Sequence, residues 1–160
     1  MPGYPVSDTG DLAMKPFDTM PGHLIRRLNQ IAVSVFQERM QALGQDLTPV
    51  QFAALQVLHS RPGIDQATLS AMIAYDRATI GGVVDRLEGK GLLERRVSQR
   101  DRRARELRLT EGGAAMLRRV QPVVEALQGD ILAGLDAAEQ AQFLALAAKL
   151  AQAGTTRSRK

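Results

Sequence analysis

The 160-residue sequence has no cysteine and no tryptophan, and aromatic residues make up only 4% of it. The lack of cysteine excludes disulfides, thiolate metal sites and thiol redox sensing. No apolar run approaches the ~18 residues that a membrane-spanning helix needs. The N-terminal segment contains acidic residues and no apolar core, unlike a signal peptide. We therefore expect a cytoplasmic protein without a membrane partner, and a core of aliphatic side chains as in helical proteins.

Motifs for catalysis are also missing. The sequence has no glycine-rich phosphate loop, no nucleophile elbow and no dense acidic cluster. The two histidines, His23 and His59, are far apart and lack the H-E-x-x-H spacing of a zinc site. We expect neither an enzyme nor a metal site, and no cofactor.

Positive charge, by contrast, is concentrated in one short segment. Residues 94–108 contain seven arginines and three acids, a net charge of +4 that equals the net charge of the whole chain. Apolar residues flank this polar turn and predict two strands: Leu92, Leu93, Val97, Leu107 and Leu109. A hairpin is a narrow ribbon, and its tip can enter a groove of nucleic acid. The alternative is a solvated basic hairpin.

Two short helices are predicted just before the hairpin. The first begins after Asp65 and the second, over residues 76–91, after Asp76, and aspartate is a favoured N-cap residue. Apolar residues at helical spacing predict one buried face for each helix: Leu69, Met72 and Ile73, then Ile80, Val83, Val84 and Leu87. Helix, turn and helix form a helix-turn-helix, whose second helix is placed to enter a major groove. The hairpin adds a wing.

Gly81 and Gly82 are adjacent in the interior of the second helix. Glycine costs roughly 1 kcal/mol relative to alanine at such positions. The pair is tolerated where the backbone must approach something closely. DNA and a neighbouring helix are the two alternatives, and the glycines alone do not separate them.

The whole chain is predicted to be mainly α, with six helices and one β-hairpin wing. We divide it into a flexible arm (1–20), dimerisation helices (21–47 and 111–153), a winged helix-turn-helix lobe (48–110) and a basic tail (154–160). Pro122 should kink or break the fifth helix. The first, fifth and sixth helices have apolar stripes, Leu127 and Ile131 included, that a small lobe covers only in part. A second copy related by a two-fold axis would bury them; an intramolecular bundle is the alternative.

Three runs of the sequence resemble the MarR family of bacterial transcriptional regulators: LTPVQFAALQVL, ATIGGVVDRLEGKGLLERR and DRRARELRLTEGG. The resemblance covers roughly residues 21–153, and the run AYDRATIGG resembles the branch that represses catabolism of aromatic and N-heteroaromatic acids, nicotinate included. The resemblance implies a homodimer on double-stranded DNA. Half-sites of a pseudo-palindromic operator would lie about one helical turn apart.

Candidate DNA contacts on the two helices follow from their exposed faces. We expect the second helix to present Arg77, Thr79, Gly82 and Arg86. Arg77 is long enough for a bidentate contact with guanine, although pairing with phosphate alone is the alternative. Thr68 and Ser70 of the first helix are candidates for phosphate contacts.

In the wing, the resemblance implies that Arg103 enters the minor groove and that Asp101 orients it. We expect Arg100, Arg102 and Arg105 to meet phosphate or water.

The resemblance also implies an effector bound between the dimerisation helices and the DNA-binding lobe. Cationic donors and an aromatic wall suit a planar aromatic carboxylate, and five residues are candidates: His23, Arg26, Arg27, His59 and Tyr75. The alternative is that these are solvated or boundary residues. Two functions follow: a repressor released by a small aromatic or N-heteroaromatic acid, or a constitutive regulatory or architectural DNA-binding protein without an effector.

Overall fold

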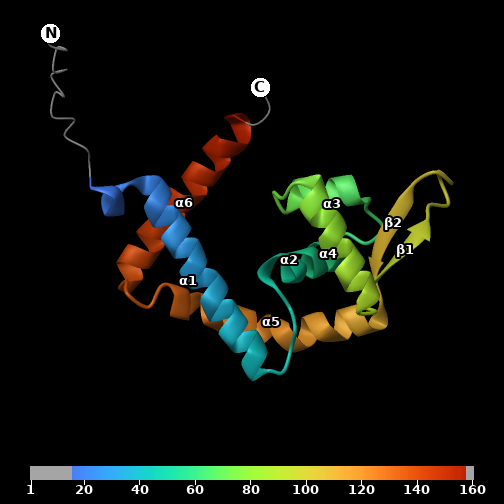
Figure 1. The fold of residues 1–160 in the computed structure, drawn as a ribbon, viewed down its shortest axis with the longest axis horizontal. Helices are drawn as coiled ribbons and strands as arrows, with labels where there is room; N and C mark the ends of the chain where they lie inside the picture. Colours follow the sequence, from blue (N-terminus) through green and yellow to red (C-terminus); the bar gives the residue numbers. More distant parts are fainter. Residues whose placement is uncertain (1–15, 158–160) are drawn as a thin grey trace, which may run out of the picture.

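The computed structural model describes residues 16–157, and in this range it confirms a mainly α fold with one antiparallel hairpin (Figure 1). The elements are η1 (Phe17–Thr19), α1 (Pro21–Ala42), α2 (Pro49–Ser60), α3 (Gln66–Met72), α4 (Arg77–Gly89), β1 (Leu93–Val97), β2 (Arg105–Leu109), α5 (Glu111–Ile131) and α6 (Ala137–Arg157). Helices α2, α3 and α4 and the hairpin form one lobe, and α5 runs from this lobe to α1 and α6. None of the helices within 16–157 is both long and apolar enough to cross a bilayer.

Helices begin where the local cap residues predict. Thr48 and Gln51 form a capping box at α2, with Gln51 N donating to Thr48 Oγ1 at 3.3 Å and Thr48 N donating to Gln51 Oε1 at 3.2 Å. Side chains of four further N-cap residues accept a bond from a backbone N–H in the first turn: Asp65, Asp76, Thr110 and Asp136. Each bond satisfies a donor that has no partner within its own helix.

The core of the lobe is aliphatic. The predicted stripe of α4 is buried throughout, and it packs with Leu55, Leu69 and Leu93. One predicted member of the α3 stripe is wrong: Met72 is exposed. It is the last residue of a seven-residue helix, whose buried residues are Leu69 and Ser70.

The apolar stripe of α5 corrects the expected dimer surface. Leu117, Val120, Val124 and Leu127 are buried within the chain, where α5 packs against α1 and α2. Large apolar side chains remain exposed instead on α1 and α6: Leu24, Ile25, Leu28, Ile31, Leu144, Leu146 and Leu150. The surface that a second chain can cover therefore lies on α1 and α6, because α2 already covers the inner face of α5.

Three features of the secondary structure differ from the sequence-based expectation. Helix α5 continues through Pro122 without a break, with buried Val120 and Val124 on either side of the proline. Helix α6 extends to Arg157 instead of ending at 153. Phe17–Thr19 form a 3-10 helix in the segment predicted as a flexible arm, while residues 1–15 of that arm lie outside the described residues.

The base of the wing meets α5 at a glycine. A Cβ added to Gly113 would lie 1.8 Å from the carbonyl oxygen of Leu92, far inside van der Waals contact. The start of α5 can approach this backbone only because residue 113 has no side chain.

Candidate nucleic-acid interface

A tight turn joins α3 to α4 and sets the start of α4. The Ser70 hydroxyl donates to the Tyr75 carbonyl oxygen at 2.6 Å, and Ala74 between them adopts a φ of 55°. Ser70 is buried. Its expected role as a phosphate contact is therefore wrong, because the hydroxyl holds the turn together. Thr68 is exposed, and its backbone N–H donates to Asp65 Oδ1 at 2.7 Å.

The exposed face of α4 contains the four residues expected there: Arg77, Thr79, Gly82 and Arg86. The Thr79 hydroxyl and backbone N–H both donate to the Asp76 carboxylate, at 2.5 and 2.8 Å. These bonds hold the pKa of Asp76 below its usual value. Thr79 thus strengthens the N-cap of α4 in the absence of DNA.

The adjacent glycines of α4 have different surroundings. A Cβ on Gly81 would lie 3.3 Å from Gln66 Nε2 of α3, so this glycine serves helix packing. A Cβ on Gly82 would meet nothing within 4 Å. The alternative of a neighbouring helix therefore applies to Gly81, whereas Gly82 stays a candidate for close approach to DNA.

The base of the wing has charges that compensate one another. Antiparallel pairing places Glu94 opposite Arg108 and Arg96 opposite Glu106 on one face of the hairpin. Arg96 Nη2 lies 2.5 Å from Glu94 Oε1, and Arg108 Nη2 lies 3.2 Å from Glu106 Oε2. Hydrogen bonds from Ser98 and Arg108 lower the pKa of Glu106. This face of the hairpin adds little net charge.

The tip of the wing has the uncompensated positive charge. Ala104 N donates to Asp101 O at 2.9 Å, and Arg103 N donates to Asp101 Oδ1 at 2.9 Å. Asp101 therefore shapes the turn through the backbone N–H of Arg103, and its role in orienting the Arg103 side chain toward DNA stays a prediction. The four exposed arginines of the tip make no ion pair with a described residue, although the charge of the first also acts on Glu106: Arg100, Arg102, Arg103 and Arg105.

The five candidate effector residues lie in three places. Arg26 Nη2 donates to His23 Nδ1 at 3.2 Å, and the Phe17 ring packs on His23 with centroids 4.3 Å apart. The exposed neighbour Arg27 takes no part in this contact. His59 lines a pocket of about 370 Å³ beside Arg96 and Arg108 of the wing, and Tyr75 is exposed in the α3–α4 turn. Within one chain, His23 and Arg26 contact each other, whereas Arg27, His59 and Tyr75 lie apart from this pair.

A cavity that sequence reasoning missed lies between α1, α2 and α5. Its volume is about 240 Å³, and its lining is mainly apolar: Asn29, Ala32, Val33, Phe36, Pro49, Phe52, Val124, Leu127, Gln128 and Ile131. The rings of Phe36 and Phe52 are 6.1 Å apart. The sequence feature that could have indicated this cavity is Asn29, a polar residue at helical spacing from the apolar residues Ala32 and Phe36.

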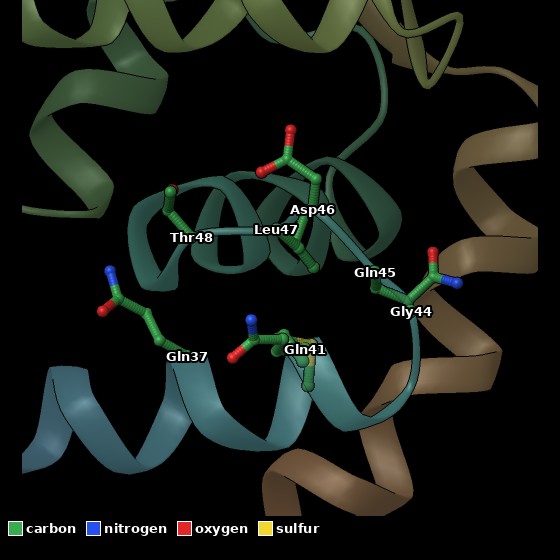
Figure 2. Close-up of a pocket in the computed structure, with 8 residues that line it drawn as sticks. Gln37, Gln41, Gly44, Gln45, Asp46, Leu47 and Thr48 are labelled. Carbon is green, nitrogen blue, oxygen red and sulfur yellow. The ribbon is translucent and has the colours of Figure 1, made fainter.

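A more polar pocket of about 500 Å³ lies between the C-terminal half of α1 and the loop to α2. Figure 2 shows Gln37 and Gln41 projecting from α1 toward Thr48. The same loop is tied to the end of α4, because Lys90 Nζ lies 2.9 Å from Asp46 Oδ2 and also donates to the Asp46 carbonyl oxygen. The Lys90 contact lowers the pKa of Asp46. No predicted effector residue lines this pocket.

Comparison with known proteins gives a consistent result. The model of the MarR family matches residues 47–104. The chain is 34% identical to the HTH-type transcriptional repressor NicR of Pseudomonas putida over 84% of this chain and 85% of the repressor. Among solved structures, it resembles Bordetella bronchiseptica BpsR, whose DNA binding is regulated by 6-hydroxynicotinic acid (TM-score 0.80, 30% identity, 86% of this chain and 97% of BpsR). It also resembles a MarR variant of E. coli complexed with operator DNA (TM-score 0.76, 28% identity, 86% of this chain and 99% of the other).

Proposed function

The chain belongs to the MarR family of transcriptional regulators, and we propose that it is a homodimeric repressor released from a pseudo-palindromic operator by a small aromatic carboxylate. The observation that supports this most directly is the combination of an exposed helix face, on α4, with a wing tip whose arginines make no ion pair with a described residue. Both surfaces belong to one lobe (Figure 1). A major groove and the adjacent minor groove are the polyanionic surfaces that they fit.

The proposed DNA contacts divide by groove. Arg77, Gly82 and Arg86 of α4 would face the major groove, where Arg77 can read guanine. Arg103 at the wing tip would enter the minor groove, whose negative potential attracts arginine. The remaining tip arginines would neutralise phosphates and raise affinity without reading sequence.

The proposed dimer uses the exposed apolar surface of α1 and α6. A groove of about 600 Å³ between them is lined almost entirely by apolar side chains: Ile25, Leu28, Phe143, Leu146, Ala147, Leu150 and Ala151. Exposed apolar surface of this extent marks an interaction site. A second copy would bury it and place two α4 helices on the same side of the DNA.

The proposed effector site is the cavity between α1, α2 and α5. It is slightly smaller than the roughly 300 Å³ at the low end for drug-sized ligands, which suits a single-ring acid. Arg26 lies one helical turn before Asn29 on α1, and His23 contacts Arg26. A carboxylate near Asn29 would thus have a cation within reach, and Phe36 and Phe52 would flank its ring. NicR and BpsR are regulators similar to this chain, and 6-hydroxynicotinic acid regulates BpsR, so an N-heteroaromatic acid is the first choice.

Operator selection from random DNA, followed by titration with 6-hydroxynicotinate, benzoate, salicylate and hydroxycinnamate, tests this proposal. An effector must bind the DNA-incompetent form more tightly. A tenfold loss of operator affinity needs about 1.4 kcal/mol of coupling, and operator must weaken effector binding by the same factor. Equal affinity of every acid for free and DNA-bound protein would support the constitutive regulator instead.

Arg26→Ala and Arg27→Ala provide a matched pair for locating the site. The two residues are adjacent and equally charged, but only Arg26 contacts His23 and lies on the row of Asn29. Arg26→Ala should abolish the response to the acid and keep operator binding, while Arg27→Ala should retain the response. The reverse result would place the carboxylate on the His23–Arg27 face of α1.

A further inference from the structure

Arg95 makes contacts unlike those of the other wing arginines. Its Nη1 pairs with Glu88 and its Nη2 with Asp85, and its backbone N–H donates to Glu88 Oε1 at 3.3 Å. Both carboxylates belong to α4, three residues apart, and therefore lie on one face of that helix. One strand residue thus joins the wing to the proposed recognition helix at two points.

The surroundings of Arg95 favour a fixed geometry. Its side chain is 27% exposed, against 62% for the neighbouring Arg96. Arg95 projects toward α4, whereas Arg96 projects from the opposite face of β1 and pairs with Glu94 of its own strand. A guanidinium that pairs with two carboxylates has little rotational freedom and transmits position better than a lysine would.

The wing is also attached through the middle of β2: Gly63 N donates to the Leu107 carbonyl oxygen at 2.9 Å, and Leu107 N donates to the Ile64 carbonyl oxygen at 2.8 Å. The hairpin has two strands; buried Leu93 lies at the end near α5, and buried Leu107 lies in the middle of β2, opposite Arg95. Beyond them, Val97 is exposed. A two-stranded ribbon is marginally stable without further packing. Because Arg95 pairs with Leu107, its contact with α4 adds a second attachment at this level, on the side of β1, and the tip extends beyond both.

We propose that Arg95 is a positioning residue for operator recognition, which fixes the angle between wing and α4 so that both can occupy adjacent grooves at once. The inference rests on the proposed DNA-binding function. Without the Arg95 contact, α4 could bind its groove while the wing tip samples several directions. The tip arginines would still attract DNA of any sequence. Specific binding would weaken and non-specific binding would not.

Arg95→Ala and Arg96→Ala form a matched pair that separates position from charge. Each removes one positive charge from adjacent positions of β1. We measure affinity for operator and for unrelated DNA across a salt series, with thermal melting to confirm folding. Arg95→Ala should lower the ratio of operator to non-specific affinity about tenfold, and Arg96→Ala should leave this ratio unchanged. Equal ratios for both variants and the parent would overturn the role of Arg95.

For the double variant Asp85→Asn/Glu88→Gln, a purely electrostatic role and a positioning role predict opposite changes in operator binding. It removes two negative charges beside the DNA and retains Arg95, so electrostatics alone would tighten operator binding. Loss of position predicts a weaker operator preference, with hydroxyl-radical protection lost at the minor groove and protection of guanine N7 from dimethyl sulfate retained in the major groove. Adding Arg95→Ala should then cause no further loss. Tighter operator binding with both grooves protected would refute the inference, whereas failure of the parent protein to select any operator would refute the proposed function itself.

Discussion

The winged lobe and the terminal helices differ in what covers their apolar side chains. In the lobe, Leu55 and Leu87 are 0% exposed, because α2, α3, α4 and the hairpin surround them. On the terminal helices, Ile25 is 61% exposed and Leu150 is 68% exposed. The lobe buries its apolar side chains within one chain, whereas the apolar side chains of α1 and α6 need a partner chain to be buried. Helix α5 belongs to both regions, since its stripe is buried and its ends reach each of them.

The wing repeats this contrast with charge. Arg96 and Arg108 at its base pair with Glu94 and Glu106 of the same hairpin. The arginines at its tip have no such partner within the described residues. In both cases, one region has its apolar or charged partners within the chain and supports a second region whose partners belong to another molecule. That molecule is a second chain for the helices and DNA for the tip.

The largest expected effect comes from charging the groove between α1 and α6. Leu146→Asp together with Leu150→Asp should convert the dimer to a folded monomer, because burying unpaired carboxylates costs several kcal/mol. Analytical ultracentrifugation measures the change, and melting of the lobe reports its folding. Leu127→Asp is the control, since Leu127 is buried within the chain and its replacement should unfold the lobe. A dimeric double variant would place the interface elsewhere.

Gly113→Ala should destabilise the junction between the two regions by about 3 kcal/mol, because the new Cβ would overlap the Leu92 carbonyl oxygen and force the backbone to move. Chemical denaturation measures the free energy of unfolding. Gly129→Ala in the same helix is the matched control: a Cβ there meets nothing within 4 Å, so this variant should gain roughly 0.5–1 kcal/mol. Similar losses for both variants would mean that glycine at 113 is not required for close approach.

The smallest effect should separate the tip of the wing from its base. Arg103→Ala should weaken operator binding by on the order of 1–3 kcal/mol, because its guanidinium is proposed to lie in the minor groove. Arg108→Ala should have little effect, since Arg108 is already paired with Glu106. Fluorescence anisotropy at moderate salt measures both. If Arg108→Ala weakened binding as much as Arg103→Ala, the division of the wing into a paired base and an open tip would fail.

Much of the fold follows from local signals in the sequence. The caps at Thr48, Asp65 and Asp76 act within four residues of chain, so their effect needs no tertiary context. The buried face of α4 follows from helical spacing, and the two strands follow from the alternation of leucines around a polar turn. The concentration of positive charge at residues 94–108 likewise points to a polyanionic partner before any fold is known.

Other features depend on contacts between residues far apart in the chain, and only the tertiary structure decides them. A stripe such as that of α5 shows that Leu127 is buried, but not whether its own chain or a second one covers it. Ser70 has the residue type of a phosphate contact, yet its hydroxyl bonds the Tyr75 carbonyl oxygen. Composition also cannot distinguish Arg95 from Arg96. Adjacent strand residues point to opposite faces of the hairpin, and only the packing of α4 against one of those faces assigns them different partners.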